Sequence, residues 1–154
     1  MSDRIDKQMS VRELRVTYRL RPDLPAFDGG QVLSTPRSAA GYLVPILQSE
    51  PVEVFVVVCL TAKHRVLGYR EIARGAVNTV HVSSAEVFKT VLLSNAPAFM
   101  VAHSHPSGDP TPSPEDQALT RTLVAGAALF GVEMLDHIVV AGERYYSFKE
   151  GGEI

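Results

Sequence analysis

Three features that often define a protein class are scarce in this sequence: cysteine, long apolar runs and net charge. The one cysteine, Cys59, lies inside an apolar segment, so a disulfide framework is excluded and a buried thiol is expected. The longest clean apolar run, residues 54–60, is far shorter than the roughly 20 residues that span a bilayer. The first thirty residues carry Arg, Asp and Lys where a signal peptide needs an apolar core. We therefore expect a cytoplasmic protein with no membrane partner.

Size and charge describe an ordinary globular chain. Its 154 residues are 45% apolar and 21% charged, with a formal net charge of −2. Such a balance indicates neither a polyanionic partner nor an acidic membrane surface. The length suits one well-buried domain, and no linker long enough to separate two domains is present. We divide the chain into an N-terminal strand and loop extension, residues 1–30, and one folded domain, residues 31–154.

Residues 11–21 alternate between apolar and polar side chains. Leu14, Val16, Tyr18 and Leu20 would lie on one side, and the arginines and Glu13 on the other. This period of two predicts a half-exposed strand. Its arginine face is either a solvated surface or a contact for phosphate or an acidic partner.

The rest of the chain alternates between strand-like and helix-like segments. We expect a first helix to begin at Thr35 and to be distorted or shortened by Pro45, and a second to run from Ser83 to Ser94. The expected strands are residues 51–60, 66–72, 77–82, 98–102, 132–141 and 145–148, with Gly75 between the third and the second. This order predicts a mixed β-sheet flanked by helices, an α/β or α+β sandwich.

The most informative stretch runs from His103 to Asp116. His103 and His105 stand two residues apart at the end of a strand, so both rings project to the same side. Ser113 and Pro114 open a helix with acidic residues in its first turn, which brings Asp116 back toward the imidazoles. Two imidazoles and one carboxylate form the three-ligand set of a catalytic zinc site, with a fourth position for water.

Other polar residues have simpler interpretations. His64, His81 and His137 are each interpreted as structural or solvated. The pair formed by His137 and the preceding aspartate can also orient a metal ligand through hydrogen bonds. Asp109, between glycine and proline, is interpreted as a turn residue. Glu53 either marks the mouth of its strand and points to water, or acts as a catalytic base near the metal.

These residues together resemble a known pattern. Glu53, the His-x-His pair, a spacing of seven residues, Ser113, two further residues and Asp116 match the motif of JAB/JAMM (MPN+) metalloenzymes. The amino-acid sequence of residues 105–110, 136–140 and 146–148 resembles that of the RadC-like branch. The resemblance extends over roughly residues 52–151. The resemblance implies one cytidine-deaminase-like JAB/MPN sandwich.

The resemblance also implies roles for the matched residues. His103, His105 and Asp116 would be ligands of Zn²⁺, and Glu53 would be the general acid and base that moves the proton of the attacking water. Ser113 would stabilise the oxyanion, a role that competes with capping the helix. Glu50 and Glu71 are rival candidates for the base.

The chain departs from the RadC-like pattern at two places. Ser104 stands where many such chains carry asparagine, and residues 83–85 replace a His-Pro-Arg segment, which bears on partner binding. The chain matches no helix-hairpin-helix module, so direct DNA binding is disfavoured.

Two classes of function follow from the resemblance. The first is a zinc-dependent metallopeptidase or isopeptidase acting on a protein or peptide, with the C-terminal tail of a ubiquitin-like protein as one substrate class. An amide-bearing small molecule is a further substrate for the same site. The second is a non-catalytic module in DNA repair or maintenance. The sequence specifies no oligomeric state.

Overall fold

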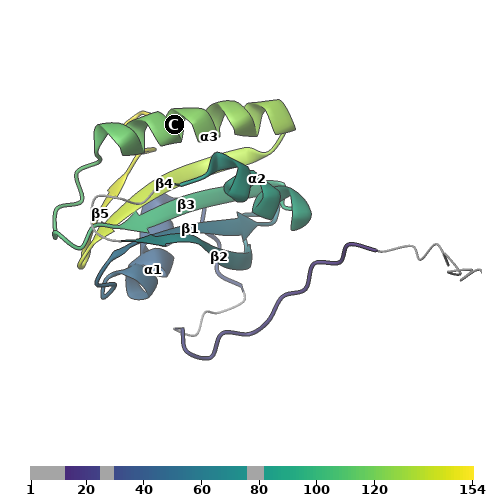
Figure 1. Ribbon diagram of the computed structural model, residues 1–154, viewed down its shortest axis with the longest axis horizontal. Helices are drawn as coiled ribbons and strands as arrows, with labels where there is room; N and C mark the ends of the chain where they lie inside the picture. Colours follow the sequence, from purple (N-terminus) through teal and green to yellow (C-terminus); the bar gives the residue numbers. More distant parts are fainter. Residues whose placement is uncertain (1–12, 25–29, 76–81) are drawn as a thin grey trace, which may run out of the picture.

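The computed structural model describes residues 13–24, 30–75 and 82–154 of the chain. A five-stranded sheet with the order β2-β1-β3-β4-β5 forms its middle layer, with α1 on one face and α2 and α3 on the other (Figure 1). The elements are α1 (Pro36–Leu47), β1 (Glu53–Leu60), β2 (Val66–Gly75), α2 (Ser84–Leu93), β3 (Ala98–Ser104), α3 (Pro114–Phe130), β4 (Glu133–Ala141) and β5 (Arg144–Ser147). The predicted α/β sandwich with a mixed sheet is confirmed.

Strand direction brings three strand ends together. β3 and β4 are parallel and joined through α3, whereas β1 is antiparallel to β3. The carboxyl ends of β3 and β4 and the amino end of β1 therefore meet at one end of the sheet. α3 begins at this same end, because its first residue follows β3 after a loop of residues 105–113.

The sheet is buried on both faces, which explains the uninterrupted apolar run in β1. Val54, Val56 and Val58 pack toward α1, and Phe55 and Val57 pack toward α2 and α3. All residues from 54 to 60 are buried, as a central strand requires. Cys59 is 2% exposed, so the expectation of a buried thiol is confirmed.

The helices begin where their capping residues predict. Thr35, Ser83 and Ser113 are the N-caps of α1, α2 and α3, and their side chains accept backbone N–H groups three residues later. Gly131 ends α3 in the left-handed conformation, with φ of +66°. The effect expected of Pro45 is wrong in part, because α1 runs on to Leu47. Pro45 lies in the last turn and is exposed, so it costs one ladder bond where water can replace it.

Other expectations need correction or lie outside the described residues. No strand forms over residues 13–21, the described part of the first predicted strand; that segment runs outside the sheet domain (Figure 1), and its apolar side chains are exposed. The strand predicted for residues 66–72 is longer than expected, because β2 continues to Gly75. The predicted strand at residues 77–82 lies, except for Val82, outside the described residues, and Val82 itself is in no strand. Within the described ranges, no helix is long and apolar enough to cross a bilayer.

Candidate metal centre

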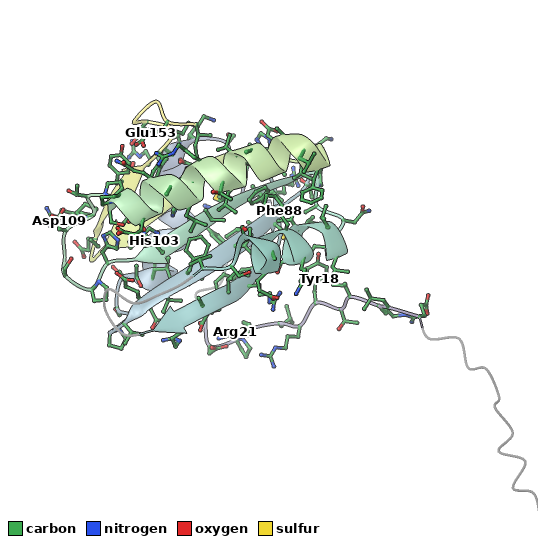
Figure 2. The ribbon with its side chains drawn as sticks, turned by 45° about the horizontal axis from the view of Figure 1, so that its top comes forward. Tyr18, Arg21, Phe88, His103, Asp109 and Glu153 are labelled. Carbon is green, nitrogen blue, oxygen red and sulfur yellow. The ribbon has the colours of Figure 1, made fainter. Side chains whose placement is uncertain are left out.

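The two histidines of the His-x-His pair stand at the end of β3. His103 is in the strand and 5% exposed, and its neighbour on β1 is Phe55, whose ring stacks on the imidazole with centroids 5.9 Å apart. His105 follows the strand but is still fixed to the sheet, because its N–H donates to the carbonyl of Val140 on β4 at 2.7 Å. Both imidazoles therefore lie on the face covered by α3, with His103 near the start of that helix (Figure 2).

The structure brings His103, His105 and Asp116 together into a compact triangle. The two Nε2 atoms are 2.9 Å apart, and the Asp116 oxygens lie 3.2 Å from His103 Nε2 and 3.4 Å from His105 Nε2. All three ligand atoms fall within 4.8 Å of one another. In a tetrahedral zinc site with bonds of about 2.0–2.1 Å, neighbouring ligand atoms are roughly 3.3 Å apart. The triangle thus has the dimensions of such a site.

The hydrogen-bonding chemistry of His105 also fits a metal. Its Nδ1 lies 2.9 Å from the backbone oxygen of Asp109, and a carbonyl oxygen only accepts. The proton of the neutral ring is therefore assigned to Nδ1, which leaves a lone pair on Nε2 facing His103 and the Asp116 carboxylate. Lone pairs that converge in this way need a positive charge between them, which a cation supplies.

The pKa values of His105 and Asp116 are shifted in the directions expected for a cation site. A hydrogen bond with Asp116 raises the pKa of His105, against an opposing effect of partial burial. Burial disfavours ionisation of Asp116, but the hydrogen bonds that His103 and His105 donate to it when protonated outweigh burial and hold the pKa of its carboxyl well below the usual range. The site therefore favours an ionised carboxylate and added positive charge.

The loop between the histidines and α3 is held by its own hydrogen bonds. Asp109 accepts from the backbone N–H and the hydroxyl of Thr111, at 3.0 and 2.7 Å, so it is the turn residue that the sequence predicts. Gly108 turns the chain with φ of +83°, and its carbonyl accepts a hydrogen bond from Arg144 of β5. Figure 2 shows Asp109 on the outer side of this loop. The loop thus holds the Asp109 carbonyl that contacts His105.

Ser113 both caps α3 and faces Asp116, a candidate metal ligand. Its hydroxyl oxygen accepts from the Asp116 N–H at 3.1 Å, and its own N–H donates to Asp116 Oδ2 at 2.8 Å. This reciprocal pair fixes the carboxylate rotamer. Because capping uses a lone pair of the hydroxyl, it does not consume the O–H proton. The hydroxyl proton of Ser113 therefore remains available to a second partner, and its competition with oxyanion stabilisation stays a prediction.

Glu53 opens β1 on the side of the metal ligands. It stands two residues before Phe55, which stacks on His103, so alternation directs both side chains to the same face. Continued by two residues beyond the pair of Phe55 and His103, the β1–β3 register places Glu53 opposite His105. The charge of Glu53 also raises the pKa of His105, but less than the contacts with Asp116 and the Asp109 backbone do. It lies outside the ligand triangle, as a proton carrier rather than a ligand would.

The rival bases are engaged elsewhere. Arg74 pairs with Glu50 through contacts of 2.7 Å and with Glu71 at 2.9 Å. Both carboxylates thus already have the same guanidinium as their partner. This arrangement favours Glu53 among the three glutamates.

The sequence left His137 open between a structural role and support of a metal ligand, and did not predict its contact with His103. His137 is fully buried on β4, and its Nε2 lies 2.8 Å from Nδ1 of His103. Its neighbour Asp136 does not take part, because that carboxylate bonds Ser147 at 2.6 Å and the backbone of Lys149 at 3.0 Å. Burial raises the pKa of Asp136. The available signal was an imidazole within an apolar strand at a position that alternation turns toward the core.

A cavity of about 220 Å³ opens beside His105. Its wall includes Leu47 and Glu50 from the end of α1 and its following turn, together with Ser104 and Gly108. Of the three residues of the ligand triangle, only His105 lines this cavity.

Comparison with known proteins agrees with this geometry. A profile of the RadC-like JAB domain matches residues 33–153. The chain belongs to the RadC-like JAB family. Similar proteins include UPF0758 proteins from Methylibium petroleiphilum, 45% identical over 121 residues, and from Symbiobacterium thermophilum, 42% identical over 120 residues. A UPF0758 protein from Moorella thermoacetica is 39% identical over 139 residues.

The match covers most of this RadC-like chain but only part of the relatives. The alignments include 79%, 78% and 90% of the chain and 54%, 51% and 61% of the three relatives, in the order given. The chain therefore spans little more than half the length of the curated relatives it matches. What a whole RadC-like protein does is accordingly a matter for the proposal below.

Proposed function

We propose that this domain is a zinc-dependent hydrolase of amide bonds, acting as a peptidase or isopeptidase. The observation that carries the proposal is the triangle of His103, His105 and Asp116, together with Glu53 on the same face of the sheet. A bound zinc ion would lower the pKa of water to about 7 and polarise the carbonyl of the substrate.

The side chains of the domain supply the proton transfers. Glu53 takes a proton from the attacking water and delivers it to the leaving amine, which needs a carboxylate outside the ligand set. The Ser113 hydroxyl donates to the oxygen of the former carbonyl as negative charge develops there. Since the Ser113 backbone and the Asp116 carboxylate hold each other, this donor is fixed before the substrate arrives.

The substrate class we propose is an extended peptide or the C-terminal tail of a ubiquitin-like protein. An extended chain can pair with an exposed strand edge, which would direct one of its carbonyl groups toward the ligand triangle. The same site would also accept a small-molecule amide.

The test combines metal analysis with cleavage. The protein loaded with zinc is incubated with a ubiquitin-like protein fused to a C-terminal extension, and release of the extension is measured. Glu53→Gln should retain full zinc occupancy and lose about 10²–10⁴-fold in rate. Glu71→Gln is the matched control, because Glu71 is held by Arg74, and should cleave nearly as well as the wild type. Full zinc occupancy with equal activity of the wild type and Glu53→Gln would contradict this mechanism.

The alternative is a non-catalytic module in DNA repair or maintenance. The N-terminal arginines are its clearest support, but Arg15 pairs with Glu13 at 2.8 Å and Arg21 with Asp23 at 2.6 Å. DNA binding that weakens steeply with salt and survives removal of metal would favour this alternative, because phosphate contacts need no zinc.

A further inference from the structure

Behind the metal ligand His103 lies a chain of buried hydrogen bonds that the proposed mechanism does not use. His103 Nδ1 lies 2.8 Å from Nε2 of His137, whose Nδ1 lies 2.6 Å from the hydroxyl of Thr120. That hydroxyl lies 2.7 Å from the backbone oxygen of Asp116. The chain of contacts thus leads from one metal ligand back to the residue that provides another.

Proton positions along this chain follow from its last member. The carbonyl of Asp116 can only accept, so the Thr120 hydroxyl donates to it and must accept from His137 Nδ1–H. A neutral His137 then has a bare Nε2, which accepts from Nδ1–H of His103. His103 is left with its lone pair on Nε2, the atom that faces His105 and Asp116.

The reverse order of protons does not suit a metal. If Thr120 donated to His137, its oxygen would stand 2.7 Å from the Asp116 carbonyl with no proton between them. The relay would then place a proton on Nε2 of His103, at the centre of the ligand triangle. Only the first arrangement satisfies every contact and leaves the ligand atom free to bind.

The ring of His137 is also held in place mechanically. It stacks on Phe148 with centroids 4.7 Å apart and an interplanar angle of 9°, and it meets Phe55 edge to face at 5.7 Å. Thr120 and His137 are 1% and 0% exposed, so water does not compete for these hydrogen bonds.

We propose that His137 and Thr120 are positioning residues, which hold the ring of His103 in the one tautomer and orientation that can ligate zinc. This inference rests on the zinc site of the proposed function, and it gives β4 and the second turn of α3 a direct part in metal affinity. Partners that orient a metal-bound imidazole typically change metal affinity by about 10–100-fold.

Zinc affinity measured by competition with a chromophoric chelator tests the proposal without any substrate. Thr120→Val and His137→Phe should bind zinc roughly 10–100-fold more weakly than the wild type. His137→Gln should restore most of the loss, because an amide can accept from His103 and donate to Thr120. The matched control is Thr90→Val. Thr90 of α2 is also buried and also donates to the carbonyl four residues earlier, at 2.9 Å, but it contacts Arg70 instead of a ligand. Its zinc affinity should equal that of the wild type.

A second measurement needs no variant. Nitrogen-15 NMR of the zinc-loaded wild type should show the His137 proton on Nδ1 and a bare Nε2. A proton on Nε2, or unchanged zinc affinity in both Thr120→Val and His137→Phe, would overturn the proposal. A protein that binds zinc as expected but cleaves no amide would contradict the proposed function and leave this inference standing.

Discussion

The hydroxyl of Ser104 accepts a hydrogen bond from the backbone N–H of Val54 at 2.9 Å, and so joins the end of β3 to the start of β1. The same hydroxyl donates to the carbonyl of Val52 at 3.1 Å. These two bonds hold the backbone on both sides of Glu53. The residue between the two histidines thus connects the proposed metal ligands to the proposed base.

Replacing Ser104 should therefore affect both stability and proton transfer. In Ser104→Ala the buried N–H of Val54 loses its partner, which should cost about 1–3 kcal/mol of unfolding free energy in urea titrations. Zinc content should stay the same while the cleavage rate falls, because Glu53 is less well fixed. Ser107→Ala, in the exposed loop, is the control and should change neither quantity. Wild-type stability in Ser104→Ala would show that the two hydrogen bonds of the Ser104 hydroxyl contribute nothing.

Metal removal should lower thermal stability. A ligand that binds only the folded state at a hundredfold excess over its Kd adds about 2.7 kcal/mol to the free energy of unfolding. Calorimetry with zinc and with a chelator should therefore show a higher melting temperature for the zinc form. Asp116→Asn, which lacks the anionic ligand, should lose most of this difference. An equal zinc-dependent shift in Asp116→Asn would place the ion elsewhere.

Acid should destabilise the metal-free protein through His137. Burial lowers the pKa of this ring in the folded state, whereas the unfolded chain takes up a proton near pH 6.5. The contribution of the neutral ring is complete above pH 6.5 and is lost as the pH falls below it, by up to about 1.4 kcal/mol per pH unit.

The measurement is urea unfolding between pH 5 and 7.5 with a chelator present. His105 acts in the opposite sense, because its pKa is raised and its contribution fades as the pH rises. The difference between wild type and His137→Gln isolates the buried ring, since His105 is common to both. Parallel pH profiles for the two proteins would rule out a neutral buried His137.

Two substitutions at Ser113 should separate capping from catalysis. Ser113→Ala removes cap and hydroxyl and should cost about 1 kcal/mol of stability, whereas glycine caps nearly as well as serine and should cost only a few tenths. If the hydroxyl stabilises the oxyanion, both variants should lose about 10²–10³-fold in rate. Ser113→Thr keeps both functions and should retain activity. Rates that follow stability rather than loss of the hydroxyl would indicate a purely structural serine.

The sequence predicted best what is encoded locally. Ser113, Pro114 and Asp116 set the start of α3 within four residues, and His103 and His105 share a face because strand geometry requires it. Both results depend on neighbours along the chain. The ligand triangle could accordingly be anticipated before any tertiary contact was known.

Features that depend on distant partners were harder to predict. Residues 13–21 alternate like a strand, but a strand also needs a neighbour, and Leu14 and Leu20 remain 76% and 94% exposed. The contact of His137 with His103 arises only because β4 pairs in parallel with β3, a register that no local pattern specifies. The periodicity of a segment could be read from the sequence, but the strand with which it pairs could not.

The parallel pairing of β3 with β4 also bears on the order in which the domain matures during translation. A growing chain that has reached Phe130 already contains Glu53 and all three proposed ligands, but the strand carrying His137 is still to be synthesised. On the proposed role of His137, an ion captured by such a nascent chain would exchange readily until β4 adds to the sheet. Tight binding of one metal ion would thus be reached late, after most of the domain has left the ribosome.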